Sequence, residues 1–378
     1  MMPRPSIERV LVLGYGAIGD LIFLLPALAA LRQGLPKARI TFLANRHPGS
    51  EELIPNTGLV DEVWFDDSKL LRRILSASFD AVIASQATPF RPFVLKLLGI
   101  PIRIGHCRPL RAPNDGWSPL RYAFWRFKRA MISDEFERRW VFNKKVLVAE
   151  DLEHAVSRNL RLVEALGLPI PKASECRPAL PVPETAVRFA KQLLPDTREK
   201  TIGLHIGSPQ SQYAKIWPPE KWAEVCRLLS QSYRLRLALI GGPEEAGLVP
   251  RFKSCYREPF TDLVGKSNLL ESFSLIQRCD LFLSNDTGMS KAAMALDVPT
   301  ATVWGPSDRP GYGIVWNPSR HTEIFLPLPC SPCVRMGLRA EGSNVINFAN
   351  CGHHACLETL PPRSVFEAVQ KRYGGILQ

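Results

Sequence analysis

The stretch Ser284-Asn-Asp-Thr-Gly-Met-Ser-Lys-Ala-Ala293 follows a short apolar run, Leu281-Phe-Leu283, and opens a helix-like pattern. A second apolar run covers residues 299–304 and ends in the polar turn Gly305-Pro-Ser-Asp308. This order predicts a strand, a tight turn, a helix and another strand. Repeats of that unit build an α/β fold around a parallel sheet, so this stretch decides the fold class.

The turn Asp286-Thr287-Gly288 would place unbonded backbone N–H groups at the start of the predicted helix. Such a helix end carries partial positive charge and binds phosphates, and Gly288 would let a phosphate approach the backbone closely. The side chain of Asp286 or Thr287 could equally be a plain helix cap without a ligand. The turn alone leaves both interpretations open.

A second strand, glycine turn and helix is predicted over residues 9–31. Its turn, Gly14-Tyr-Gly16-Ala-Ile-Gly19, matches the fingerprint of dinucleotide-binding domains. That fingerprint also needs an acidic residue at the end of the next strand, but residues 39–44 are followed by Asn45-Arg46. An NADP-dependent oxidoreductase that uses Arg46 is therefore one alternative function.

Asp20 directly follows the third glycine of this turn. It would lie in the first turn of the helix, at the carboxyl end of the first strand, where open α/β sheets bind their ligands. A carboxylate at this position can cap the helix, or it can act as a general base toward an incoming hydroxyl.

Several motifs in this order resemble glycosyltransferase family 9, the ADP-heptose:lipopolysaccharide heptosyltransferases. The resemblance rests on Gly16-Ala-Ile-Gly19-Asp20 with Pro26-Ala-Leu28, His205-Ile-Gly-Ser208, Lys215-Ile-Trp-Pro218, Leu239-Ile-Gly-Gly-Pro-Glu244, Asn285-Asp-Thr-Gly288 and Gly305-Pro-Ser-Asp308. It implies an inverting transfer of heptose or a similar sugar from an ADP-sugar to a hydroxyl of the lipopolysaccharide core or another glycan. It also implies that catalysis needs no cofactor.

The resemblance assigns roles to individual residues. Asp20 would be the catalytic base, and Gly16 and Gly19 would form the acceptor or phosphate loop. Lys215, as a second catalytic residue, would stabilise the leaving diphosphate. The donor would be bound by Ser208, Glu244, Asp286, Thr287, Gly288, Met289 and Lys291, with Glu244 on the ribose. Lys291 departs from the family pattern, which commonly has histidine there, so the sugar preference is open.

The order of predicted elements agrees with the GT-B architecture that the resemblance implies, two Rossmann-like doubly wound domains facing a central cleft. A proline-rich stretch over residues 169–183 separates two alternating sets of strands and helices. We expect an acceptor-binding domain over residues 1–175 and a donor domain over 176–361, the latter with a cysteine-containing loop at 330–356. Residues 362–378 would form a last helix that crosses back to the first domain.

Composition indicates a soluble globular protein, with 46% hydrophobic and 22% charged residues. No apolar run reaches the roughly 18 residues that span a bilayer, and the N-terminus does not resemble a secretion signal. We therefore expect a cytoplasmic protein. The net charge of +12 indicates anionic partners.

Basic residues gather in residues 103–111 and, interleaved with aromatic residues, in 121–129. The second run would suit an anionic membrane surface near an anionic glycolipid or glycan acceptor, which would make the protein peripheral on the inner face of the cytoplasmic membrane. An ordinary solvated helix face is the alternative, and we expect no nucleic-acid partner. A non-catalytic GT-B-like protein that binds glycan or lipid through this surface is a further alternative function.

Four of the nine cysteines form a spaced set: Cys330, Cys333, Cys351 and Cys356. The pattern C-x2-C, seventeen residues, C-x4-C is plausible for a tetrahedral thiolate site, which would hold structural zinc or iron. Free thiols, and after them disulfides, are the alternatives. The other five cysteines are scattered and are most simply buried thiols.

Overall fold

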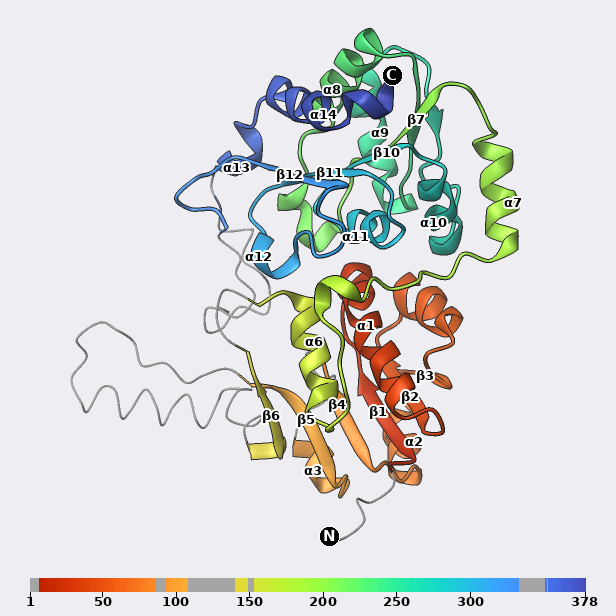
Figure 1. The fold of residues 1–378 in the computed structure, drawn as a ribbon, viewed down its shortest axis with the longest axis vertical. Helices are drawn as coiled ribbons and strands as arrows, with labels where there is room; N and C mark the ends of the chain where they lie inside the picture. The colour runs from red at the N-terminus through yellow and green to blue at the C-terminus, as the bar shows by residue number, and fades with distance from the viewer. Residues whose placement is uncertain (1–6, 86–92, 108–139, 149–152, 333–350, 352) are drawn as a thin grey trace, which may run out of the picture. The chain divides into compact units, whose positions relative to one another are not determined.

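The computed structural model describes residues 7–85, 93–107, 140–148, 153–332, 351 and 353–378. These residues form two compact units, Met1–Cys176 and Arg177–Gln378, each an α/β unit with its own sheet (Figure 1). The fold class predicted from the alternation of strands and helices is confirmed. None of the helices in these described ranges combines the length and apolar character needed to cross a membrane.

The first unit is built on a parallel six-stranded sheet in the order β3-β2-β1-β4-β5-β6. Its elements are β1 (Arg9–Leu13), α1 (Ile18–Gly34), β2 (Arg39–Ala44), a π-helical turn η1 (Gly49–Leu53), η2 (Ile54–Thr57), β3 (Glu62–Phe65), α2 (Leu70–Ser76), β4 (Ala81–Ala84), α3 (Phe93–Leu97), β5 (Ile102–Cys107), β6 (Lys144–Leu147), α6 (Ala155–Glu164) and η3 (Ala173–Glu175).

Helix α1 is buried along most of its length, because its sequence is apolar on every side from Leu21 to Leu31. Its start is fixed by Asp20, whose Oδ2 accepts a hydrogen bond from Ala17 N at 3.0 Å. Packing explains why a glycine stands at the start of the preceding turn, because a Cβ on Gly14 would come within 2.1 Å of the Phe42 ring. The first glycine of the apparent dinucleotide fingerprint is thus required by contact with β2.

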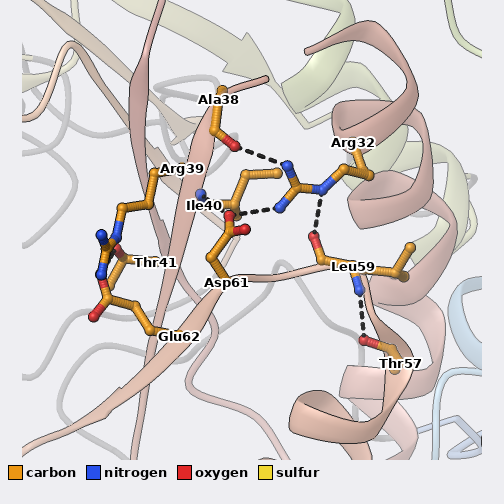
Figure 2. Close-up of polar contacts among 9 residues, drawn as sticks. All are labelled: Arg32, Ala38, Arg39, Ile40, Thr41, Thr57, Leu59, Asp61 and Glu62. Atoms are coloured by element: carbon orange, nitrogen blue, oxygen red, sulfur yellow. Dashed lines mark hydrogen bonds and ion pairs between the residues drawn. The ribbon is translucent and has the colours of Figure 1, made fainter. Parts of the chain in front are cut away.

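The end of α1 is tied to the strands that follow by Arg32 (Figure 2). Its guanidinium donates to Ala38 O at 2.8 Å and to Asp61 Oδ2 at 2.6 Å. The same Asp61 oxygen accepts from Ile40 N at 2.6 Å. These bonds join the turn before β2 to the turn before β3, which positions β2 beside β1 and β3 beside β2.

The second unit has a parallel six-stranded sheet in the order β12-β11-β10-β7-β8-β9. Its elements are α7 (Glu184–Leu193), β7 (Lys200–His205), η4 (Gln210–Lys215), α8 (Pro219–Ser232), β8 (Leu235–Leu239), η5 (Pro243–Leu248), α9 (Val249–Cys255), β9 (Thr261–Asp262), α10 (Leu269–Gln277), β10 (Leu281–Asn285), α11 (Gly288–Ala295), β11 (Thr300–Trp304), α12 (Arg309–Tyr312), β12 (His321–Phe325), α13 (Ala355–Glu358) and α14 (Pro362–Leu377).

The last helix, α14, packs against α8 and β12 of the second unit. Its Val365, Phe366 and Val369 belong to the core of this unit. Tyr373 Oη donates to Thr300 O at 2.7 Å, which attaches the helix to β11. The expected crossing of residues 362–378 to the first domain stays a prediction.

One buried histidine in this unit makes stability depend on pH. Burial lowers the pKa of His321 on β12 to about 4, whereas an exposed histidine titrates near ~6.5. Between these values the unfolded chain binds a proton that the folded chain does not, so stability falls as the pH decreases from 7 to 4. This shift in the pKa of His321 lowers the free energy of unfolding by about 3 kcal/mol once the pH is below both pKa values.

We therefore expect His321→Leu to flatten this pH dependence. Urea unfolding of the wild-type and the variant, each at neutral and at acid pH, would measure it. If both proteins lose the same stability on acidification, His321 does not make this contribution.

Candidate functional site

The predicted donor-binding residues come together at the carboxyl edge of the second sheet. Strands β7 and β10 are neighbours there, although β8 and β9 lie between them in the chain. The sheet order reverses at this point, and doubly wound folds bind their ligands in the crevice outside such a switch point. Ser208 follows β7, Asp286 follows β10 and Gly305 follows β11.

Asn285, the last residue of β10, holds the surrounding loops in place. Its Nδ2 donates to Ile206 O at 2.8 Å and to Gly207 O at 3.3 Å. Its Oδ1 accepts from Trp217 N at 3.2 Å and from Trp222 Nε1 at 3.1 Å. One buried amide therefore fixes the loop after β7 and the segment that follows Lys215 beside the loop after β10.

Asp286 lies between two lysines. Lys291 Nζ is 2.6 Å from its Oδ1, and Lys215 Nζ is 3.1 Å from its Oδ2. Asp286 and Lys291 are each only 3% exposed. Burial alone would raise the pKa of Asp286, but the two ammonium groups hold it far below its usual range. The cluster thus contains two cations and one anion.

Lys291, in α11, is the site residue whose surroundings the sequence did not reveal. Its ammonium lies 4.2 Å from the centre of the Trp304 ring, within cation–π distance. Burial lowers the pKa of Lys291 from its usual value, and the Asp286 carboxylate opposes that shift. Lys291 is therefore not the solvated helix residue that its sequence position would also allow.

The start of α11 adds hydrogen-bond donors to the same edge. The Ser290 hydroxyl donates to Thr287 O at 2.8 Å and accepts from Thr287 N at 3.3 Å, which shapes the first turn. The N–H groups of Gly288 and Met289 are among those that a helix leaves without an internal partner. Within the described part of the chain, the buried hydroxyls of Ser208 and Thr287 have no hydrogen-bond partner.

Two adjacent glutamates follow β8, and they differ in burial. Glu244, the predicted ribose ligand, is exposed, whereas Glu245 is buried. Glu245 Oε1 lies 3.6 Å from His205 Nε2, and burial raises the pKa of Glu245. A Cβ on Gly207 would come within 1.9 Å of the Glu245 side chain. Glu245 is thus a buried carboxylate of this edge that the sequence analysis missed.

In the first unit, Asp20 lies in the first turn of α1, as predicted. His47, which the sequence analysis did not select, lies close by. A Cβ on Gly49 would come within 2.7 Å of His47 Cε1 and 3.1 Å of Leu21 Cδ1, so the ring packs near the start of α1. Burial lowers the pKa of His47, and the backbone of Gly16 and the Asp20 carboxylate oppose that shift.

Arg46, which the alternative NADP site would need, is already engaged. Its guanidinium is 2.8 Å from Glu51 Oε1 and lies 4.3 Å from the centre of the Phe65 ring. An arginine that binds a 2′-phosphate would have to leave this carboxylate. The geometry after β2 therefore does not favour the oxidoreductase.

The predicted cysteine site is only partly covered by the structure. Cys330 is exposed, Cys351 is half-buried and Cys356 is buried, while Cys333 lies outside the described residues. Across the described ranges, no three His, Cys, Asp or Glu side chains are grouped so as to hold a metal ion. The three described cysteines therefore do not form a metal site by themselves.

The basic run at 121–129, which was predicted to suit a membrane surface, also lies outside the described residues.

Comparisons with known proteins identify the family of this chain. Residues 120–343 match the model of glycosyltransferase family 9 (heptosyltransferase). Lipopolysaccharide heptosyltransferase 1 of Escherichia coli K12 is 26% identical over 317 residues, which cover 79% of this chain and 88% of that protein. Lipopolysaccharide core heptosyltransferase OpsX of Haemophilus influenzae is 25% identical over 301 residues, with 77% of each chain covered.

Solved structures show the same fold. E. coli ADP-heptose lps heptosyltransferase II superposes with a TM-score of 0.68 at 20% identity, covering 98% of each chain. E. coli heptosyltransferase WaaC with ADP gives a TM-score of 0.63 at 20% identity, covering 98% of this chain and 99% of that one. The chain therefore belongs to glycosyltransferase family 9, and it is a glycosyltransferase of the two-domain α/β type.

Proposed function

We propose that this protein is an inverting glycosyltransferase that moves heptose or a similar sugar from an ADP-sugar to a hydroxyl of the lipopolysaccharide core or another anionic glycan. Relatives named as lipopolysaccharide heptosyltransferases support the sugar and the acceptor. Solved relatives with ADP and with ADP-2-deoxy-2-fluoro heptose support the donor. The proposed place of action is the cytoplasm, at the inner face of the membrane that holds the acceptor.

The observation that carries this proposal is the excess positive charge around Asp286. Lys215 and Lys291 both contact its carboxylate, so one ammonium charge has no counter-charge within the cluster. The N-terminus of α11 adds partial positive charge beside it. Ser208 and Thr287 add buried hydroxyls that lack a partner in the described structure. A diphosphate would supply both the missing negative charge and the missing acceptors.

The proposed reaction follows from these charges. The acceptor oxygen forms a bond to the anomeric carbon and its proton passes to the Asp20 carboxylate. At the same time the bond from the anomeric carbon to the diphosphate oxygen breaks, and ADP leaves with the electron pair. Lys215 and the α11 N–H groups stabilise the negative charge that develops on the leaving group. A single in-line displacement inverts the anomeric configuration.

No step of this proposal requires a metal or a cofactor. Two ammonium groups and a helix N-terminus supply the positive charge that the leaving diphosphate needs. We expect turnover to persist in EDTA for that reason. The four-cysteine metal site stays a prediction, and its residues take no part in the reaction proposed here.

Calorimetric titration of the purified protein with ADP, UDP, GDP and NADP tests the donor assignment. We expect ADP to bind more tightly than the other three, because two solved structures of a relative contain ADP and ADP-2-deoxy-2-fluoro heptose. The experiment needs neither an acceptor nor an intact sugar donor. Preference for NADP would contradict the transferase proposal, and preference for UDP or GDP would contradict the assignment of the donor nucleotide.

A further inference from the structure

The first unit exposes apolar side chains on one side of its sheet, the side covered by α2 and α3. On α2, Leu70 and Ile74 are buried, whereas Leu71 and Leu75 are 58% and 66% exposed. Leu71 and Leu75 are four residues apart, so they lie next to each other along the outer surface of the helix. On α3, Leu97 is 76% exposed.

Two more apolar side chains lie at the edge of the same side. Trp140 is 57% exposed and adjoins α3, because Lys96 Nζ lies 3.6 Å from the centre of its ring. Leu147 on β6 is also exposed, and its partner in the sheet register is Cys107. Partners in a parallel ladder point to the same side, and Cys107 belongs to the core cluster of Leu70, Ile74 and Leu95 beneath α2 and α3.

We name this surface the α2/α3 face and define it by its apolar residues and its exposed cations. The apolar residues are Leu71, Leu75, Leu97, Trp140 and Leu147, and the cations are Lys69, Arg72, Lys96 and Lys145. Neither α2 nor α3 contains an acidic residue. At the start of α2, the Asp67 carboxylate is paired with Arg73 at 2.7 Å, and the neighbouring Asp66 is exposed.

We propose that the α2/α3 face binds the protein to an anionic lipid bilayer. Apolar side chains next to lysine and arginine are the composition of segments that lie in a membrane interface. Tryptophan is enriched at that depth, because its ring is apolar and its N–H is polar. The lysine and arginine stems would keep their charges at the level of the lipid phosphates while the leucines enter the acyl boundary.

Charge favours a bilayer over a second copy of this chain. In a two-fold dimer the same face meets itself, so the four cations of one copy would face those of the other. Like charges that meet across an interface are unfavourable. An anionic bilayer carries the opposite charge, and each lysine or arginine near it contributes about 1 kcal/mol, or about fivefold in affinity.

The proposal adds a membrane partner to the proposed transferase, and its test does not require any turnover. Flotation of the full-length protein with two kinds of vesicle would be measured at low and high salt. One kind contains phosphatidylcholine alone, and the other also contains phosphatidylglycerol. We expect the wild-type to float with the phosphatidylglycerol vesicles at low salt, and to float less with the neutral vesicles or at high salt.

Two variants test the surface itself. Leu71→Ser/Leu75→Ser should lower vesicle affinity at least about tenfold, because two exposed leucines no longer enter the acyl boundary. Lys96→Glu/Lys145→Glu should lower it further and remove the salt dependence. The matched control is Ile376→Ser, which replaces an exposed aliphatic residue of the second unit and should leave flotation unchanged. All the substituted side chains are exposed, so thermal unfolding should not change much.

Three outcomes would overturn the proposal. In the first, the wild-type floats with neither kind of vesicle, and in the second, the two double variants float as well as the wild-type. The third is a concentration-dependent dimer in sedimentation that the leucine variant converts to monomer, which would assign the face to a second copy. Sugar transfer to a small soluble acceptor should be unchanged in both double variants. Failure of the transferase proposal would show in the transfer assay and the nucleotide titration, and not in flotation.

Discussion

Asp20→Asn is expected to lower the turnover of ADP-sugar and acceptor at least about a hundredfold, which is the scale of general base catalysis. The amide has nearly the shape of the carboxylate, but it cannot accept the proton of the acceptor hydroxyl. Its carbonyl oxygen can still accept the hydrogen bond that Asp20 Oδ2 receives from Ala17 N at 3.0 Å, so α1 should keep its start. ADP affinity should be unchanged. Initial rates of ADP release and a titration with ADP measure the two effects separately.

Asp67→Asn is the matched control for this variant. Asp67 is an exposed aspartate of the same unit whose carboxylate pairs with Arg73. We expect this substitution to leave turnover with a soluble acceptor unchanged. Near-normal turnover of Asp20→Asn would show that Asp20 is only a helix cap.

Lys215→Met is expected to weaken ADP binding about ten- to a hundredfold. The substitution removes the ammonium 3.1 Å from Asp286 Oδ2 and leaves the carboxylate paired with Lys291. The cluster then has equal numbers of cations and anions, so it no longer has the excess charge that attracts a diphosphate. A hydrogen bond to a charged group contributes about 1.5–3 kcal/mol, which corresponds to the expected change in affinity.

Titration with ADP measures this change, and thermal unfolding confirms that the variant is folded. Lys253→Met is the control, because Lys253 is an exposed lysine of the same unit that pairs with Asp262. The control should bind ADP like the wild-type. If Lys215→Met also binds ADP like the wild-type, the excess charge beside Asp286 does not hold the diphosphate.

Much of the fold was predictable, because periodicity and turn residues are local properties. The runs at 39–44, 281–284 and 300–304 are strands, and the turn at 286–288 starts a helix. The chemistry of the site was less accessible. Two lysines that are 76 positions apart in the chain reach one aspartate, and this depends on Asn285 tying the loops together. No local pattern encodes such a contact.

Neighbouring residues of the same type show a second limit of sequence patterns. Glu244 and Glu245 have the same chemistry, and the pattern alone does not show which side chain turns inward from the turn η5. The structure buries Glu245, because Gly207 and Gly241 leave room for its side chain. The glycine turn at 14–19 shows the same limit, since contact with Phe42 accounts for Gly14 without any dinucleotide.

Turnover of ADP-heptose by the wild-type protein, with a lipopolysaccharide-core acceptor and in the presence of EDTA, tests the central claim most directly. Release of ADP and the anomeric configuration of the product would be measured together. We predict that ADP is released only when the acceptor is present, in equal amount to the transferred sugar, and that the new linkage has the configuration opposite to that of the donor. Absence of transfer from ADP-heptose and from every other nucleotide sugar tested, by protein that is folded and binds ADP, would contradict the account.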